Sequence, residues 1–219
     1  MVDADWMPKF NDTLDDWNKR FVITSPDVDG LLSAALMVQH YDARLIGIYT
    51  TSHLILFDDF TSEAAKEALW VDHDINYPGI RCMGQHLVRI QVKDKLHTRH
   101  NPNFNPNLIW PVAWENCFNG RQVSKVDKYP FATIHYLMKG LGIEDPPKYS
   151  KAYSLLAHAD GTWVTSYDYP YNCNQWREWM FDDWPGVIND LVNKTYADDR
   201  SLSVHLGILS DLLEAGIVL

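Results

Sequence analysis

The sequence predicts an α/β fold, in which a mostly parallel sheet is flanked by helices and followed by a short helical C-terminal extension. Two observations favour this fold class. Short apolar segments suited to buried strands alternate along the chain with helical segments, which is the order of a parallel α/β sheet. Of the 219 residues, 46% are hydrophobic, which is enough to bury a core.

The chain opens with a polar leader, residues 1–20, predicted as a short helix or a packed arm with Trp6 and Trp17 as anchors. A strand over residues 21–24 then runs into the turn SPDVDG, residues 25–30, and on into a helix whose apolar residues recur at helical spacing. A turn punctuated by Pro and Gly in this way sits at the carboxyl end of a strand, where open α/β sheets bind ligands.

The turn carries two acids, Asp27 and Asp29. We expect both side chains on one face of extended backbone, because residues two apart on a strand point the same way. Carboxylates held like this suit a hard divalent cation. The alternative is structural: Asp29 caps the helix and Asp27 forms an Asx turn.

The rest of the chain continues the alternation. Strands are predicted over residues 43–50, 53–57, 68–72 and 80–83, and helices over residues 61–69, 129–141, 148–159, 174–181, 185–193 and 201–215. In the helix over 129–141, Pro130 suits the first turn and Gly142 follows the end. The last helix is amphipathic, and its leucine stripe indicates core packing or the seam of a homodimer.

Composition excludes several classes of protein. No apolar run of about 18 residues and no apolar leader are present, which argues against a membrane span and against secretion. Cys82, Cys117 and Cys173 form no CxxC pair and are predicted to be free thiols, which favours a cytoplasmic location. The net charge of −10 argues against binding long nucleic acid and is compatible with a small phosphorylated ligand held at a cation-rich site.

Acidic residues recur where the predicted elements end. Because acids at the ends of several elements of one sheet can converge on a single cleft, these positions are candidates for one site. They are Asp27 with Asp29, Asp72 with His73 and Asp74, and Asp160, joined by Gln85 and His86 at a fourth end.

Four segments follow one another between residues 20 and 166: VITSPDVDGLLSAAL, ALWVDHDI, GIRCMGQHL and LLAHADGTW. In this order they resemble the motifs of the DHH phosphoesterase superfamily, which includes RecJ-type exonucleases, oligoribonucleases and family II inorganic pyrophosphatases. The second segment is similar to the V-D-H-N form of the pyrophosphatases, and the third stands where the Asp-His-His motif is expected. HNPNFNP and SKVDKYPFATIHYLM are similar to the Asn-Pro-Asn segment and Ser-rich helix of RecJ-type members.

The resemblance implies a metal-dependent phosphoesterase or phosphohydrolase that acts on a small nucleotide, a short oligonucleotide or a related phosphate. It implies that Asp27 binds a first metal ion, Asp29 a second, that Asp72 bridges them and that Asp160 completes the second. The ions would activate water for in-line attack. His86 would contact the phosphate or protonate the leaving oxygen, unless it is a structural histidine.

The chain departs from the family at its metal ligands. Ser25 stands where most members carry His or Asp, and Gly84 and Gln85 replace the Asp and first His of Asp-His-His. The remaining donors, with neutral oxygens from Ser25 and Gln85, are all oxygen. We therefore expect Mg²⁺ or Mn²⁺ with Mg²⁺ favoured, unless His73, a second candidate catalytic residue, serves as a substitute ligand.

The chain also departs in length. The resemblance implies that residues 1–170 form a DHH-type domain, and we expect residues 171–219 to form a helical extension packed on it, too short for the usual substrate domain. Its tryptophans form core or, as the alternative, a lid that stacks a base. Two competing hypotheses remain: a non-catalytic binding or interaction module with an eroded metal site, and a generic α/β protein whose acids are caps and turn residues.

Overall fold

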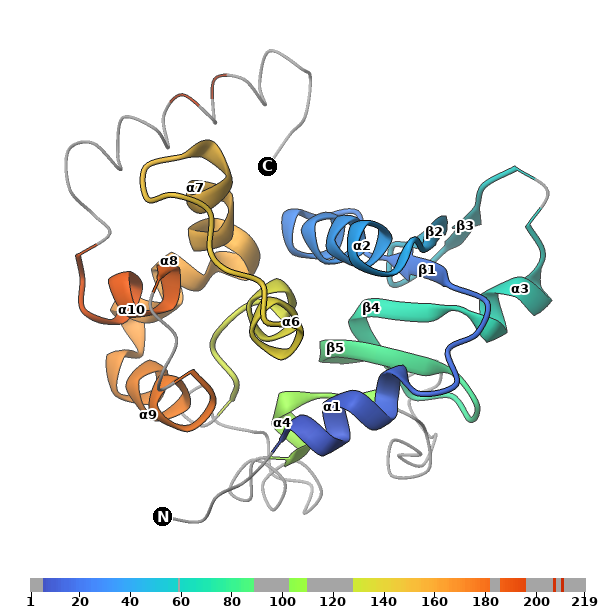
Figure 1. Ribbon diagram of the computed structural model, residues 1–219, viewed down its shortest axis with the longest axis horizontal. Helices are drawn as coiled ribbons and strands as arrows, with labels where there is room; N and C mark the ends of the chain where they lie inside the picture. The colour runs from blue at the N-terminus through green and yellow to red at the C-terminus, as the bar shows by residue number, and fades with distance from the viewer. Residues whose placement is uncertain are drawn as a thin grey trace.

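The computed structural model describes residues 6–58, 60–88, 103–109, 128–181 and 186–195, with Gly207 and Ser210. As predicted, the fold is α/β, with one sheet of six strands in the order β3-β2-β1-β4-β5-β6 (Figure 1). All neighbouring pairs are parallel except β2 with β3. The strands are β1 (Phe21–Thr24), β2 (Arg44–Tyr49), β3 (Leu54–Leu56), β4 (Leu69–Ile75), β5 (Arg81–Val88) and β6 (Asn103–Phe104).

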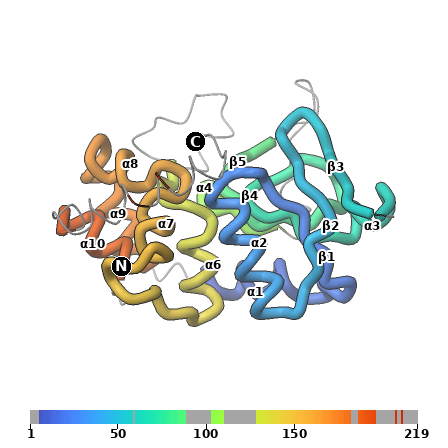
Figure 2. Tube along the Cα trace, turned by 90° about the horizontal axis from the view of Figure 1, so that it is seen from above, coloured from blue at the N-terminus to red at the C-terminus, as the bar shows by residue number. Residues whose placement is uncertain are grey.

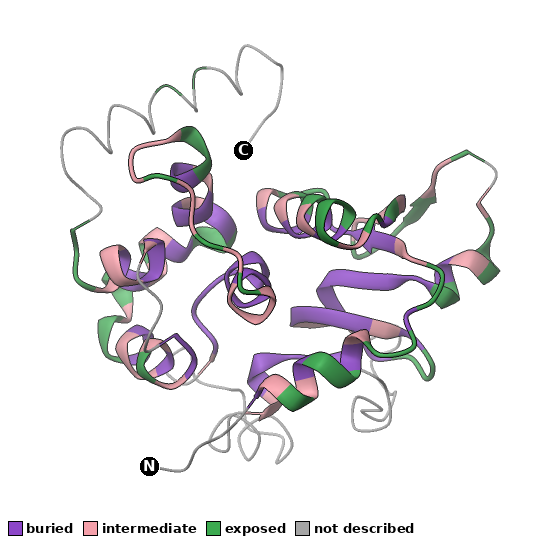
Figure 3. Ribbon diagram, viewed as in Figure 1, coloured by how far each residue is buried: buried purple, intermediate pink, exposed green. Residues whose placement is uncertain are grey.

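Helices cover both faces of the sheet, so β4 is buried at every position (Figure 3). On one face α1, α2 and α6 pack against Leu69, Val71 and Met83, and on the other α3 packs near Trp70 and Cys82. This alternation along β4 and β5 follows from the two-residue period of a strand. The helices named here are α1 (Met7–Leu14), α2 (Val28–Tyr41), α3 (Ser62–Glu67) and α6 (Thr133–Leu141).

The C-terminal helices form a separate layer, which we call the helical lobe, on the far side of α6 from the sheet (Figures 1 and 2). Trp176 is buried in this lobe against Tyr129 and Trp179, which favours the core role predicted for the tail tryptophans. The lobe contains α7 (Lys151–His158), α8 (Thr162–Asp168), α9 (Pro170–Met180) and α10 (Val187–Val192), and the short α4 (Pro106–Ile109) lies beside β5.

Several predicted boundaries were wrong. The strand expected to end at Asp72 continues to Ile75, and the strand expected over residues 80–83 continues to Val88. The helix expected from residue 129 begins at Thr133, because the side chain of His135 accepts the Ala132 N–H and closes the first turn there, so Pro130 precedes the helix.

The described residues test some other sequence predictions and leave others aside. Trp6 and Trp17 are buried anchors beside α1, and Cys82 and Cys173 are free, buried thiols, as predicted. None of the described helices is both long and apolar enough to cross a membrane. The amphipathic helix expected over residues 201–215 lies outside the described residues apart from Gly207 and Ser210, and Cys117, Trp110, Trp114 and Trp184 lie outside them entirely.

The strands β4 and β5 are parallel although only residues 76–80 join them. Straight parallel strands need a connection of about a dozen residues. At Asp72 the backbone has a φ of 69° and the register with β5 shifts. The Ile75 N–H donates to Sγ of Cys82 (3.2 Å), although the strand partner of Cys82 is Trp70, five residues earlier in β4. A straight β4 would carry Ile75 too far from Cys82 for this contact. Thus β4 turns at Asp72 instead of running straight.

The buried imidazole of His135 joins α6 to α7. Its Nδ1 accepts the Ala132 N–H (3.0 Å), and its Nε2 donates to the Leu156 carbonyl (2.9 Å). Both contacts need the neutral tautomer, because a second ring proton would point at the Ala132 N–H. Burial lowers the pKa of His135 to about 4, although the bond to Leu156 opposes this shift.

We therefore predict an acid-sensitive term in stability. Below about pH 6.5, the ordinary pKa of histidine, His135 binds a proton in the unfolded chain but stays neutral in the folded chain. The unfolding free energy therefore falls as the pH drops from 6.5 toward 4. Between pH 7 and pH 5 this histidine should cost about 2 kcal/mol of unfolding free energy. Urea denaturation at the two pH values should show a smaller pH-dependent loss for His135→Gln than for wild type. An exposed control, His53→Gln, should match wild type, and an equal loss in His135→Gln would contradict the prediction.

Candidate functional site

The candidate site lies between β1 and β4, where the parallel strand order reverses direction. From β1 the chain crosses to β2 on one side, and from β4 it continues to β5 on the other. Open α/β sheets bind ligands outside the carboxyl ends of the strands at such a switch point. Because β1 pairs with β4 through Leu69 and Trp70 only, Asp72 lies just past the end of β1, near the turn that holds Ser25 and Asp27.

Asp27 caps α2. Its Oδ1 accepts the Gly30 N–H (2.9 Å) and the Ser25 hydroxyl (3.0 Å). Asp29 lies in the first turn of the helix and not on extended backbone. The expectation that Asp27 and Asp29 share a strand face was therefore wrong, because the helix begins at Val28, before the second acid. The structural alternative was also wrong in detail, since Asp27 and not Asp29 is the cap.

Asp29 is buried and holds the start of α6. Its Oδ2 accepts the Thr133 N–H (2.7 Å), and its Oδ1 accepts the Ile134 N–H (2.9 Å) and the Ser33 hydroxyl (3.3 Å). The carboxylate thus satisfies two backbone N–H groups that a helix N-terminus otherwise leaves without partners. The observed role of Asp29 is thus to dock α6 on α2, and its role as a metal ligand stays a prediction.

Asp72 lies at the turn inside β4 and not at a strand end. Its Oδ2 accepts the Ser25 hydroxyl (2.5 Å), and its Oδ1 accepts the Thr133 hydroxyl (3.2 Å). Burial raises the pKa of Asp29 well above its usual value, and the charge of Asp72 and a hydrogen bond with it raise that pKa further; the Ile134 and Thr133 N–H groups oppose the shift. Two buried carboxylates this close need a proton or a cation between them.

His86 lies between two of the acids. Its Nε2 is 3.3 Å from Asp160 Oδ1 and 4.0 Å from Asp72 Oδ1. Burial on its own lowers the pKa of His86, but the hydrogen bond and charge of Asp160 and the charge of Asp72 raise it overall, against a small opposing effect of Lys128. The imidazole is therefore protonated more readily than an ordinary histidine.

Asp160 reaches the site from the helical lobe. It follows α7 in a single turn of 3₁₀ helix, with a φ of 49°, so it follows the end of a helix as predicted. Its Oδ2 accepts the Gln85 side-chain amide (2.6 Å). The sequence predicted that Gln85 and His86 follow the end of a strand. They lie within β5 instead, because β5 continues to Val88.

Two glycines allow the backbone to approach closely. A Cβ at Gly84 would lie 2.4 Å from the His73 nitrogen and 2.5 Å from the Asp72 carbonyl carbon. A side chain at position 84 would therefore collide with the backbone of β4. A Cβ at Gly30 would lie 1.9 Å from the Ser25 hydroxyl oxygen, so Gly30 makes room for the link from Ser25 to Asp72.

Among the residues that the structure describes, several buried atoms of the site have no hydrogen-bond partner. Both ring nitrogens of His73 and the Oε1 atom of Gln85 are in this state. Ser25 has one hydroxyl hydrogen, yet its Oγ lies within hydrogen-bonding distance of both Asp27 and Asp72. The hydroxyl can therefore donate to only one of these two carboxylates at a time.

The four carboxylates of Asp27, Asp29, Asp72 and Asp160 form no ion pair with a lysine or arginine of the described residues. Within the same ranges, no three His, Cys, Asp or Glu side chains are arranged so that they could hold a metal ion. The chemistry of the donors, with negative oxygens and an unpartnered amide oxygen, fits a divalent cation. The side chains must draw closer together to bind one.

The structure brings together all the candidate site residues. Contacts run from Asp27 through Ser25 to Asp72, on to His86 and Asp160, and from Asp160 to Gln85, while Asp29 and His73 adjoin Asp72. The hypothesis of a generic fold with scattered acids would need these acids to lie far apart, and the contacts argue against it.

Sequence reasoning missed Thr133, whose hydroxyl donates to Asp72 and whose N–H donates to Asp29. It also missed the asparagines of NFNPN. Asn103 and Asn105 donate to Asp74 (2.6 and 3.0 Å), and Asn107 donates to the backbone carbonyl of Gln85 (3.2 Å). A signal was available for Asn103 and Asn105, because asparagines two residues apart in an extended segment present their amides to one side; Asn107 lies in α4.

Comparison with known proteins gives no match: no protein-family model, no curated protein and no solved structure is similar to this chain.

The close approach at Gly84 generates a stability prediction. Gly84→Ala places a methyl group against the backbone of β4 and should lower the unfolding free energy by about 3 kcal/mol, the upper range of overpacking costs. Gly79→Ala is the matched control, because its methyl would meet nothing within 4 Å and only its φ of 83° opposes alanine. Its cost should be about 1 kcal/mol. If urea denaturation showed equal losses of unfolding free energy for Gly84→Ala and Gly79→Ala, the backbone of β4 would be able to move away from the added methyl group, and the prediction would be wrong.

Proposed function

We propose that this protein is a metal-dependent phosphoesterase or phosphohydrolase that acts on a small nucleotide, a short oligonucleotide or a related phosphate. One observation carries the proposal: Asp27, Asp72, His86 and Asp160, from four different segments, form one continuous set of contacts at the switch point of the sheet. Such a set joins acids with a readily protonated imidazole, the groups that metal-assisted hydrolysis uses.

The charge of the site supports a cation. Unpaired carboxylates repel a phosphate anion, so a phosphate can bind here only after positive charge has been added. Asp27, Asp72 and Asp160 would hold divalent ions, Mg²⁺ or Mn²⁺, with neutral oxygens from Ser25 and Gln85. When bound, such ions lower the pKa of a bound water and neutralise charge on the phosphoryl oxygens.

His86 supplies the acid. Its side chain is 36% exposed, as is that of Asp160, whereas Asp72 is 1% exposed. A phosphate therefore approaches from the side of His86, with Asp72 behind it. The Asp160 carboxylate holds the imidazole in position, and the charge of Asp160 and Asp72 favours the protonated ring. A protonated His86 can contact phosphoryl oxygens and donate its proton to the leaving oxygen.

The proposal extends to substrate size and location. A net charge of −10 disfavours long nucleic acid, which requires many basic residues along its backbone. The buried free thiols of Cys82 and Cys173 fit a reducing compartment, so we propose a cytoplasmic location.

A second candidate function is a non-catalytic binding or interaction module with the same fold. The observation that favours it concerns Asp29, which the sequence predicted as a metal ligand. Both of its carboxylate oxygens already accept N–H groups of α6, so Asp29 has a structural role instead. The two functions differ in whether the protein binds a divalent cation and turns over a phosphoester.

Metal binding at Asp72 is the first prediction from this proposal. Calorimetric titration of metal-free protein with Mg²⁺ and with Mn²⁺ should show binding, and Asp72→Asn should weaken it at least tenfold by removing a charge from the centre of the cluster. Asp58→Asn is the control, because Asp58 is exposed and pairs with Arg44 away from the site. Absence of binding to the wild type at millimolar metal would favour the non-catalytic module.

Catalysis by His86 is the second prediction. With the metal ion that binds, His86→Asn should lower kcat for a chromogenic phosphodiester about 100-fold, the lower range for loss of a general acid. Its metal affinity should stay within about threefold of wild type, because the donors at Asp27 and Asp72 remain. His53→Asn should behave as wild type. An unchanged kcat in His86→Asn would show that His86 is not the general acid.

A further inference from the structure

His73 is the part of the site to which the proposed mechanism gives no task. Its side chain is 8% exposed, and neither ring nitrogen has a hydrogen-bond partner in the part of the chain that the structure describes. Most buried histidines place at least one nitrogen against a donor or acceptor, since an unpartnered buried polar group is costly. This imidazole therefore needs an explanation.

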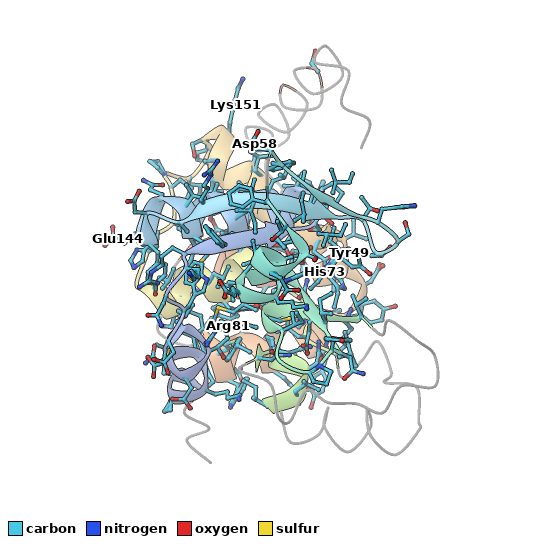
Figure 4. All side chains as sticks on the ribbon, turned by 90° about the vertical axis from the view of Figure 1, so that its right-hand side faces the viewer. Tyr49, Asp58, His73, Arg81, Glu144 and Lys151 are labelled. Carbon is cyan, nitrogen blue, oxygen red and sulfur yellow. The ribbon has the colours of Figure 1, made fainter. Side chains whose placement is uncertain are left out.

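The position of the ring is defined by its neighbours. Nδ1 of His73 lies 4.0 Å from Asp72 Oδ2, the oxygen that also meets the Ser25 hydroxyl. The ring packs edge-to-face on Tyr49, with centroids 5.5 Å apart, and Figure 4 shows these two side chains close together. It also stands perpendicular to the ring of His86 at 6.4 Å. A ring nitrogen without a hydrogen-bond partner among the described residues is thus held beside the buried carboxylate of Asp72.

We propose that His73 is a nitrogen ligand of the divalent ion bound by Asp72, and that the site therefore selects Mn²⁺ over Mg²⁺. The inference rests on the proposed function insofar as both need a cation at Asp72. Imidazole suits transition-metal ions, whereas Mg²⁺ prefers oxygen donors and retained waters. The all-oxygen set expected from the sequence favours Mg²⁺; a buried imidazole with unpartnered nitrogens beside Asp72 reverses that preference.

The distances are compatible with a modest closure. Two ligands at right angles, each about 2.1 Å from an ion, lie about 3 Å apart. Nδ1 of His73 and Oδ2 of Asp72 are 4.0 Å apart, so they must approach by about 1 Å. The Oε1 atom of Gln85, which has no hydrogen-bond partner among the described residues, is a further possible ligand near the site.

The inference is tested by metal affinity in the absence of substrate. Metal-free wild type should bind Mn²⁺ at least tenfold more tightly than Mg²⁺ in calorimetric titrations. His73→Gln should lose at least tenfold in Mn²⁺ affinity and change Mg²⁺ affinity less than threefold, because it removes a nitrogen ligand and leaves the carboxylates. His86→Gln is the matched control and should keep the Mn²⁺ preference.

A second measurement needs no variant. Pulsed electron paramagnetic resonance of the Mn²⁺-loaded wild type should show ¹⁴N modulation from a directly bound imidazole, and this signal should be lost in His73→Gln and kept in His86→Gln. Absence of the signal in wild type, its persistence in His73→Gln, or equal affinity of wild type for the two ions would overturn the inference. A Mn²⁺ preference that depends on His73, with no hydrolysis of any phosphoester, would refute the proposed function and leave this inference standing.

Discussion

The carboxylate of Asp29 accepts the first N–H groups of α6, and the arrangement of the site depends on this contact. It fixes α6 against α2, which brings the Thr133 hydroxyl to Asp72. In the same first turn of α6, the side chain of His135 donates to the Leu156 carbonyl near the end of α7, and α7 leads to Asp160. One buried cap therefore positions residues that are far apart in the sequence. Its cost is a carboxylate with a raised pKa next to a second carboxylate.

The other constraint is the turn of β4 at Asp72. It brings Asp72 and His73 together beside the end of β1, and it is possible because Gly84 has no side chain to obstruct the backbone of β4. The backbone of β4 thus occupies the space beside Gly84, and the neighbouring Gln85 donates to Asp160 through its side-chain amide.

The fold class and the positions of β1 to β5 could be predicted from the sequence because apolar runs indicate burial, whereas the two polar-flanked residues of β6 gave no such signal. Convergence of the acids was expected, but their local geometry was not. The two-residue period was applied to Asp27 and Asp29, although a helix begins between them. The ends of β4 and β5 were misplaced because Asp72, Asp74 and Gln85 are polar; their burial is compensated by Ser25, by Asn103 and Asn105, and by Asp160, partners distant in sequence. No local pattern encodes such partners.

The site is assembled from two layers of the molecule, the sheet and the helical lobe (Figure 1). Asp27 follows β1 and Asp72 lies in β4, whereas Asp160 follows α7 of the lobe. Contacts through Gln85 and His86 are the link between these acids. A cation bound among them would thus act as a removable cross-link between the layers. By mass action, an ion at 100 times its dissociation constant would add about 2.7 kcal/mol to the unfolding free energy. Chelating agents would then loosen the joint between sheet and lobe, so the metal content of a preparation would govern its resistance to heat and to proteases.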